Sequence, residues 1–558
     1  MPTQVWLYVI GVPVALCLGY RLYHRLRLSK AKHRSLTGHS KMAKRVAKLL
    51  PFYEYGEERF FACDGAPEPV ARARREALER LCATFRERAP KTIAQSQALE
   101  AHISDVEFTN AYRVPFQFRN YLHTRLQLGC LLEASAGRKV RDLDGNWSYD
   151  LSGSYGTNVF GYDFYKECVD AGIERSRELG PVLGPYHPVI ADNVRRLKAI
   201  SGMDEVSFHM SGTEAVMQAV GLARYHTGRN RAVRFCGAYH GWWDGVQPGI
   251  GNPRKVGDVF TLKEMDADAL YVLRTRKDIA CVLVNPLQAL HPNAGAPGDA
   301  TLVSSKRRAG YDREAYRQWL MQLREVCTAR SIVLIIDDVF LGFRLAYGGT
   351  QEYFGVCADM VTYGKTVGGG LPIGVVCGRA DLMKRYRPGY PSDICFARGT
   401  FNSHPYVMAS MNEFLRRTDA PEMRASYARI DELWDGRAAA LNARLEAAGT
   451  PVRVANMVSV WTTLYRAPSR YNWMLQFYLR AQGLSLSWVG SGRYIFSHDF
   501  TDEEFAEVSD RFVAAAEAMK ADGWWWEDAS LTSASISRTL LGEILRTKLG
   551  RSSVGQRA

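Results

Sequence analysis

The 558-residue sequence lacks the patterns that mark several common classes of protein. Its eleven cysteines form no C-x-x-C pair and no dense cluster, which favours free thiols in a reducing compartment over a disulfide framework. No metal site is expected, because no zinc-finger spacing of cysteine and histidine occurs. The aromatic signature of RNA-binding domains is also absent. We therefore expect no nucleic-acid partner, although the net charge is +14.

Acidic residues are missing from the first 53 positions, which contain ten lysines or arginines. Most of the net charge therefore belongs to one end of the chain, and the remainder is close to neutral. A content of 47% hydrophobic and 23% charged residues is ordinary for a globular protein. The length indicates two to four packed units.

An uncharged run at residues 5–20 lies within this basic end. No positive charge precedes the run, so a cleaved signal peptide is not indicated. The run is shorter than the roughly 20 residues that a spanning helix needs, but flanking arginines that snorkel can extend it. We predict a membrane-anchoring helix at 1–25, a basic juxtamembrane segment at 26–53, and a catalytic body in the cytoplasm. The alternative is a helix that lies in the membrane interface or packs on the body.

From about residue 138, short apolar runs alternate with helical stretches. This pattern predicts a parallel α/β sheet, in which ligands bind beyond the carboxyl ends of the strands. Residues that carry chemistry are therefore expected directly after the runs. The predicted strands are residues 205–210, 232–236, 280–285, 332–336 and 360–363.

Two of these strands are followed by candidate binding loops. Ser211, Gly212 and Thr213 open an apolar helix, where small residues and the helix dipole favour a phosphate group. An ordinary helix cap explains the same residues equally well. Tyr239 and His240 lie in an aromatic stretch beside glycines, and Tyr239 offers a face for a flat ring. Aromatic packing in the core is the alternative.

Two further strands lead into ionisable residues. Asp337 and Asp338 follow a buried strand, where a carboxylate needs a compensating partner such as a protonated pyridine nitrogen. One of the two aspartates could be only a cap. Lys365 precedes a glycine run, and partial burial there, or a second cation, would lower its pKa and make it a nucleophile. A solvated surface lysine is the usual alternative.

The chain resembles the class III aminotransferases of fold type I, most closely the glutamate-1-semialdehyde aminomutase branch. The resemblance runs from about residue 138 to about residue 520. It rests on five motifs in the family's order and approximate spacing: MSGTEAVMQAVGLAR, YHG, IIDDVFLGFR, YGKTVGGGLPIGVVCGR and GTFNSHP.

The resemblance implies pyridoxal 5'-phosphate as the cofactor, held by Lys365 as a Schiff base and paired at its ring nitrogen with Asp337. It implies that Thr400 reaches the phosphate in the neighbouring subunit, and hence a homodimer with shared sites. The other implied cofactor-binding residues are Val339 and Tyr239 at the ring faces, Ser211, Gly212 and Thr213 at the phosphate, Gln288 near the phenolic oxygen, and His240.

On the substrate side the chain departs from the branch. Tyr155 falls at an aromatic that lines this side, but Asn285 replaces a glutamate and so removes a charge. Residues 114–117 lack the arginine of the family's SPVR stretch, and Arg113 or Arg119 would have to replace it. Asp338 also stands for the family's glutamate, and no glutamate is found near residues 490–493. A substrate other than glutamate semialdehyde is therefore expected.

The predicted fold is α/β, with a mostly parallel, seven-stranded-type sheet in a large domain, a smaller α+β domain and an N-terminal apolar helix. The predicted divisions beyond residue 53 are a helical connector with the start of the small domain at 54–137, the large cofactor-binding domain at 138–415, the C-terminal small domain at 416–525 and an extension at 526–558.

The predicted function is pyridoxal-phosphate-dependent transfer of an amino group between an amino donor and an aldehyde or ketone. The anchor, together with the loss of polar groups for recognition, suggests a lipid-like substrate chain at the membrane. The same fold and cofactor also serve aminomutases, decarboxylases and enzymes that form carbon–carbon bonds. An alternative of another class is a membrane-tethered scaffold without turnover.

Overall fold

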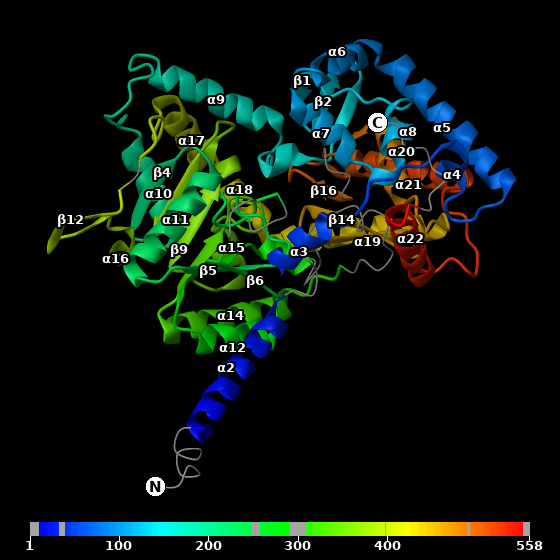
Figure 1. Ribbon diagram of the computed structural model, residues 1–558. Helices are drawn as coiled ribbons and strands as arrows, with labels where there is room; N and C mark the ends of the chain where they lie inside the picture. The colour runs from blue at the N-terminus through cyan, green and yellow to red at the C-terminus, as the bar shows by residue number, and fades with distance from the viewer. Residues whose placement is uncertain are drawn as a thin grey trace, which may run out of the picture.

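The computed structural model describes residues 11–32, 39–247, 251–252, 257–290, 309–396, 398–487 and 492–550. Figure 1 shows a larger part built around one central sheet, on the left, and a smaller part on the right. One hydrophobic cluster of buried residues extends through both parts.

The central sheet has seven strands in the order β4-β10-β9-β8-β7-β5-β6. β10 runs antiparallel to β4 and β9, whereas the pairs β9–β8, β8–β7, β7–β5 and β5–β6 are parallel. The predicted mostly parallel sheet is therefore present, and its five predicted strands are β4, β5, β7, β8 and β9. The bounds are β4 (Glu205–His209), β5 (Arg231–Phe235), β6 (Val259–Leu262), β7 (Ile279–Val284), β8 (Val333–Asp337), β9 (Met360–Gly364) and β10 (Gly374–Gly378).

Both faces of this sheet are buried, and successive residues of β8 show the alternation that a strand requires. Val333 and Ile335 belong to a cluster with α11 (Gly212–Thr227) and α16 (Ala380–Met383). Leu334 and Ile336 belong to the main core with the helices of the opposite face. These helices are α10 (Ile190–Ser201), α12 (Ala267–Thr275), α14 (Arg313–Arg330) and α17 (Pro405–Thr418), and α9 (Tyr162–Ser176) packs on α17.

The smaller part contains an antiparallel sheet in the order β13-β14-β16 and a four-stranded sheet in the order β1-β2-β3-β15. α19 (Ile430–Ala447) packs on β13, and α20 (Leu475–Ala481) packs on α21 (Asp502–Ala521). The strands are β1 (Leu132–Ala136), β2 (Lys139–Asp142), β3 (Trp147–Asp150), β13 (Val452–Met457), β14 (Val460–Tyr465), β15 (Leu484–Ser485) and β16 (Arg493–Ile495).

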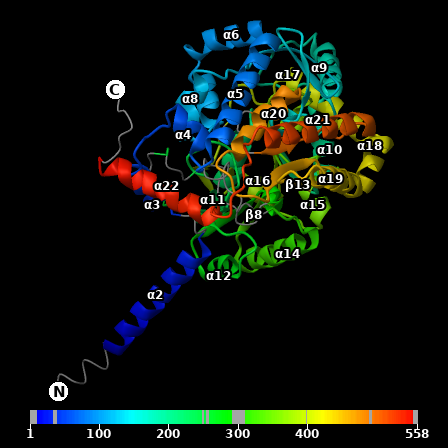
Figure 2. The same cartoon turned by 90° about the vertical axis from the view of Figure 1, so that its right-hand side faces the viewer.

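Helices from both ends of the chain cover the smaller part. Near the C-terminus, Trp524 and Trp525 are buried and donate hydrogen bonds to Tyr478 and Asn472, at 2.7 and 2.9 Å. The last helix, α22, lies near α4 (Figures 1 and 2), where Arg59 donates to Glu543 on α22 at 2.6 Å. The bounds are α3 (Ser40–Ala47), α4 (Glu57–Ala62), α5 (Glu68–Arg88), α6 (Pro90–Glu100), α7 (Ser104–Tyr112), α8 (Arg119–His123) and α22 (Ser533–Lys548).

The N-terminal helix corrects the prediction of a membrane anchor. α2 (Val12–Ala31) projects from the body (Figures 1 and 2), and it contains four cations from Arg21 onward. Among the residues that the structure describes, no helix is long and apolar enough to cross a membrane. The predicted anchor, and the localisation based on it, are therefore wrong; residues 5–10 of the apolar run lie outside the described residues.

The C-terminal half of α2 packs on the catalytic body, as in the alternative to the membrane anchor. Arg27 makes an ion pair of 2.9 Å with Asp268 on α12, and its guanidinium lies 4.2 Å from the centroid of the Tyr271 ring. Lys32, directly after the helix, forms an isolated bridge with Leu262 at the end of β6.

Candidate active site

A cavity of about 810 Å³ lies at the carboxyl ends of the central strands. Every predicted site residue except Thr400 lines it, although these residues come from segments as distant as positions 155 and 365. Thr400 is exposed and lies outside this wall. The predicted residues on the wall are Tyr155, Ser211, Gly212, Thr213, Tyr239, His240, Asn285, Gln288, Asp337, Val339 and Lys365.

Lys365 occupies the turn that leaves β9, and its backbone adopts a left-handed φ of +50°. Burial lowers the pKa of its ammonium group; Asp337 opposes this change, and Arg344 adds to it. The lysine Nζ also lies 5.4 Å from the ring centroid of Phe340. A surface lysine is thereby excluded, and a larger neutral fraction makes Lys365 a better nucleophile.

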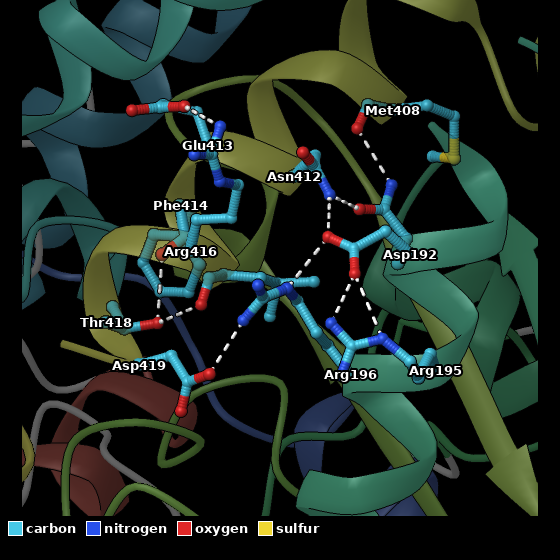
Figure 3. A network of polar contacts seen from close by, with 12 residues as sticks. Asp192, Arg195, Arg196, Met408, Asn412, Glu413, Phe414, Arg416, Thr418 and Asp419 are labelled. Atoms are coloured by element: carbon cyan, nitrogen blue, oxygen red, sulfur yellow. Dashed lines mark hydrogen bonds and ion pairs between the residues drawn. The ribbon is translucent and has the colours of Figure 1, made fainter. Parts of the chain in front are cut away.

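The turn that carries Lys365 rests on α17, which the network in Figure 3 fixes in place. Ser410 on α17 donates from Oγ to the carbonyl oxygen of Gly369 at 2.9 Å. Two residues along the helix, Asn412 donates from Nδ2 to Asp192 on α10 at 2.8 Å, and Arg196 joins Asp192 to Asp419. These bonds join α10 to α17, so they fix the position of α17 under the turn that carries Lys365.

Asp337 lies at the end of β8, where it makes a buried pair with His240. Its Oδ2 is 2.7 Å from His240 Nδ1, and its Oδ1 accepts from the Val339 amide and the Thr362 hydroxyl, at 3.2 and 3.3 Å. Both side chains are almost fully buried. The other ring nitrogen of His240, Nε2, is buried without a hydrogen-bond partner among the described residues.

Asp338 has a structural position and does not line the cavity. It accepts hydrogen bonds from the amide and hydroxyl of Thr350, at the start of α15 (Gly349–Phe354). Burial raises the pKa of Asp338 to about 7. A Cβ on Gly349, whose φ is +69°, would lie 2.4 Å from the Asp338 carboxylate. The second aspartate thus holds the first turn of α15, whose N-cap residue is Gly348.

The loop before α11 is built so that backbone and hydroxyl groups reach the cavity. Ser211 accepts from the Glu214 amide at 3.2 Å and thus caps the helix. A Cβ on Gly212 would lie 2.5 Å from Val339 Cγ1, and one on Gly241, with φ +89°, would lie 2.6 Å from Thr213 Oγ1. Because Gly212 and Gly241 have no side chains, a ligand can come close to the N-terminus of α11. A helix N-terminus favours an anion as that ligand.

Comparison with known proteins agrees with the family resemblance that the sequence motifs indicate. The family model described as aminotransferase class-III matches residues 121–515. The chain belongs to the class III aminotransferase family. A glutamate-1-semialdehyde 2,1-aminomutase of Geotalea daltonii is 29% identical over 413 residues, covering 69% of this chain and 90% of that protein. The aminomutase of Flavobacterium johnsoniae is 32% identical over 349 residues, covering 59% and 76%.

Solved structures show the same fold. A transaminase with PLP bound has a TM-score of 0.58 at 28% identity and covers 71% of this chain and 92% of its own. A glutamate-1-semialdehyde aminomutase from Pseudomonas aeruginosa PAO1 has a TM-score of 0.64 at 18% identity, covers 80% and 99%, and supports the fold alone. The predicted family and fold type I are confirmed, and the chain is a pyridoxal-phosphate-dependent enzyme.

The cavity of this class III protein fits the cofactor by the chemistry of its wall. Tyr239 is half exposed toward the cavity, Asp337 supplies a buried carboxylate, and Lys365 supplies the amine. Gly212 and Gly241 leave space beside the helix N-terminus that any larger residue would fill. A flat aromatic aldehyde with a phosphate group requires these four features together.

Sequence reasoning missed Phe340 and Arg344, although both lie in the motif IIDDVFLGFR. Phe340 lines the cavity, and a Cβ on Gly156 (φ +92°) would lie 2.4 Å from its ring. Arg344 is fully buried and donates to the carbonyl oxygens of Asn158 and Phe496, at 3.0 and 2.6 Å. Their place in a quoted motif, three and seven residues after Asp337, was the signal that could have identified them.

The two arginines suggested as replacements for the family's arginine do not line this cavity. Arg113 and Arg119 line a separate cavity of about 190 Å³ beside α7, α8 and α20. Arg119 donates from Nε to the Val114 carbonyl oxygen at 2.9 Å. Arg113 is buried close to Tyr155, on the substrate side of the main cavity. Arg493, which the sequence did not single out, lines the main cavity.

Proposed function

We propose that this class III enzyme is an aminotransferase that moves an amino group between an amino donor and an aldehyde or ketone. The observation that carries the proposal is the buried Lys365 with a lowered pKa, in one cavity with the Asp337–His240 pair. Pyridoxal phosphate, when bound, supplies the electron sink that weakens bonds at the substrate carbon.

The proposed roles come from the resemblance to the family, and the position of these residues on one cavity wall supports them. Asp337, oriented by His240, holds the proton on the ring nitrogen. Tyr239 and Val339 confine the ring, while Gly212 and Thr213 hold the phosphate at the start of α11. Gln288 is proposed at the phenolic oxygen, with Tyr155 and Asn285 on the substrate side. Lys365, once freed by the incoming amine, carries the proton to and from the substrate carbon.

Asn285 has a supporting contact for its proposed place. It donates from Nδ2 to the Tyr239 carbonyl oxygen at 3.3 Å, and its Oδ1 accepts from the Leu287 amide at 3.2 Å. It therefore ties the loop after β7 to the loop that presents Tyr239. A glutamate at this position would add a charge to the cavity wall, so the asparagine supports a substrate different from that of the aminomutases.

The proposal includes a homodimer in which Thr400 completes the neighbouring phosphate site. The exposure of Thr400 in the single chain agrees with a role at an interface. A lipid-like substrate is not part of the proposal, because its motive was the membrane anchor. The aminomutase reaction is the second candidate, since the curated relatives carry that name.

The absorbance of the lysine-bound cofactor tests the site. Purified protein reconstituted with pyridoxal phosphate should be yellow. Lys365→Ala should lose that absorbance and turnover, whereas Lys277→Ala, on an exposed loop, should keep both. If the wild-type protein stays colourless in excess cofactor, the proposed enzymatic function is wrong and a non-catalytic scaffold is favoured.

Product analysis separates the reaction types that share this cofactor. With an isotope-labelled amino acid as donor, transamination must leave the corresponding oxo acid and transfer the amino group to a second molecule. An aminomutase returns the amino group to a neighbouring carbon of the same molecule, and a decarboxylase releases carbon dioxide. Either result in place of the oxo acid would contradict the aminotransferase proposal.

A further inference from the structure

The turn that carries Lys365 contacts α9 as well as α17. Tyr165 on α9 has its hydroxyl oxygen 2.6 Å from Oγ1 of Thr366, the residue directly after Lys365. The two residues are 6% and 2% exposed, so water does not compete for this hydrogen bond. Neither is among the described residues that line the cavity of about 810 Å³. The bond therefore acts on the lysine turn and not on a ligand.

The position of Tyr165 is fixed by a second hydrogen bond and by packing. The Val159 amide donates to the phenol oxygen at 3.0 Å, which leaves the phenol proton available for Thr366. Burial raises the pKa of Tyr165, so this proton is retained at neutral pH. The Tyr165 ring is also stacked on Phe414 of α17, with 6.3 Å between the ring centroids.

One peptide group joins Tyr165 to Arg344. Its N–H, from Val159, donates to Tyr165, and its carbonyl oxygen, from Asn158, accepts from Arg344 Nη2 at 3.0 Å. A peptide group that accepts at one end and donates at the other is polarised, and this polarisation strengthens both hydrogen bonds.

Arg344 also bonds to the smaller part of the protein. Its Nη1 donates to Ser459 Oγ and to the Phe496 carbonyl oxygen, at 2.7 and 2.6 Å. Ser459 lies between β13 and β14, and Phe496 directly follows β16. A series of consecutive hydrogen bonds therefore connects the smaller part to the lysine turn, through Arg344, the peptide group and Tyr165.

The backbone of Lys365 requires such support, because its φ of +50° is unfavourable for a residue with a side chain. A conformation of this kind persists only where the surrounding structure holds it. From α17, Ser410 holds the far end of the turn at Gly369. From α9, Tyr165 holds Thr366, the position next to the lysine. Loss of the second contact therefore loosens the residue that must direct its amine into the cavity.

We propose that Tyr165 is a positioning residue, which holds Lys365 in its left-handed conformation through Thr366 and couples the lysine to the smaller part through Arg344. The inference rests on the proposed function, since it deepens the role of Lys365 in the same site. Tyr165 touches neither cofactor nor substrate in this role. It acts on the orientation and the hydration of the lysine amine.

The rate at which the full chain, freed of cofactor, captures pyridoxal phosphate tests the proposal, with the absorbance of the lysine-bound cofactor as the signal. Thr366→Val keeps the branched shape and removes the hydroxyl, and Tyr165→Phe removes the other partner. Each should slow capture about tenfold, the loss expected for one buried hydrogen bond. Thr366→Ser should restore most of the rate. The double variant should be no slower than the slower single variant, because both substitutions remove the same bond.

The pH dependence of capture is a readout that a merely structural defect would not move. Burial lowers the pKa of Lys365; Asp337 opposes this change, and Arg344 adds to it. Water that reaches a loosened turn weakens the effect of burial, whereas Asp337 and Arg344 stay in place. The pH of the half-maximal rate should therefore be higher in Thr366→Val than in wild type. Ser459→Ala removes one bond of the series in the smaller part and should slow capture about two- to fivefold.

The control variant is Thr450→Val, which removes a buried hydroxyl that donates to the Leu445 carbonyl oxygen, beside β13. It should capture the cofactor at the wild-type rate. The final absorbance, once capture is complete, shows that each variant is folded; if Tyr165→Phe is not, Thr366→Val decides.

Capture within twofold of the wild-type rate in Thr366→Val and Tyr165→Phe would overturn the proposal, as would equal slowing in the control or an unchanged rate in Ser459→Ala. A double variant that loses the product of the two single losses would overturn it too. Retained colour in Lys365→Ala would contradict the proposed function. Loss of that colour, together with unaffected capture in Thr366→Val, would contradict the role of Tyr165 alone.

Discussion

One buried carboxylate holds the C-terminal helix α22 on the body, and its removal should have a calculable effect. The Glu543 side chain is 4% exposed and accepts from Tyr53, Tyr55 and Arg59, at 2.9, 2.6 and 2.6 Å. Arg470, itself buried, donates to it at 3.1 Å. Burial opposes ionisation, but the charge and hydrogen bonds of Arg470 outweigh it and lower the pKa of Glu543 to about 2.

The size of the effect follows from this pKa. A fall from 4.5 to about 2 corresponds to about 3 kcal/mol of stabilisation of the docked helix. Loss of one partner from a buried ion pair costs about 3–5 kcal/mol, which agrees. Because the folded pKa lies below the unfolded one, this stability is complete above about pH 4.5 and is lost as the pH falls through about 2. Glu543→Gln should therefore free α22 about a hundredfold more often at neutral pH.

Hydrogen exchange of the α22 amides measures this opening directly, and does not require two-state unfolding of the whole chain. The amides of α22 in Glu543→Gln should exchange about a hundredfold faster than in wild type. Glu446→Gln breaks an exposed pair with Arg466 and should change exchange less than fivefold. A change below fivefold in Glu543→Gln as well would refute the reasoning.

Three further substitutions test the site and the core. Gly241→Ala places a Cβ 2.6 Å from Thr213 Oγ1 at a φ of +89°, so cofactor affinity, measured by equilibrium titration, should fall at least tenfold. His240→Phe removes the bond of 2.7 Å to Asp337 and should lower kcat ten- to a hundredfold; unchanged turnover would show that Asp337 needs no orientation. Burial raises the pKa of Glu264 to about 8. The stability linked to Glu264 is therefore complete below about pH 4.5 and is lost as the pH rises through 8, so Glu264→Gln should raise the melting temperature at pH 8 and not at pH 5.

The cofactor side of the site could be predicted because it depends on local patterns. A short apolar run forms a buried parallel strand, and parallel strands bring their carboxyl ends to one edge. Asp337 at the end of β8 and Lys365 directly after β9 are therefore neighbours. β10 was missed because it begins at Gly374, two residues after Pro372, and such residues weaken a strand signal. β10 pairs antiparallel with β9, and the direction of this pairing cannot be predicted from the local sequence.

The remaining features depend on contacts between distant segments. Glu543 meets Tyr53 across 490 residues, and nothing near either residue in the sequence indicates the other. The hydrogen bond from Gln476 to the Arg113 carbonyl oxygen likewise requires the packing of α20 on the N-terminal helices. The error at α2 arose from a local pattern. The apolar run was interpreted as a membrane-spanning helix, although the cations from Arg21 onward belong to the same helix.

The division between predicted and missed residues follows the division of the site itself. The cofactor side, from Lys365 to Thr213, is built on strand ends of the central sheet. The substrate side takes Arg493 from β16 and Tyr155 from a strained turn with φ +58°, both in the smaller part. We therefore expect the chemistry of the class III family, with a substrate that differs from that of the aminomutases.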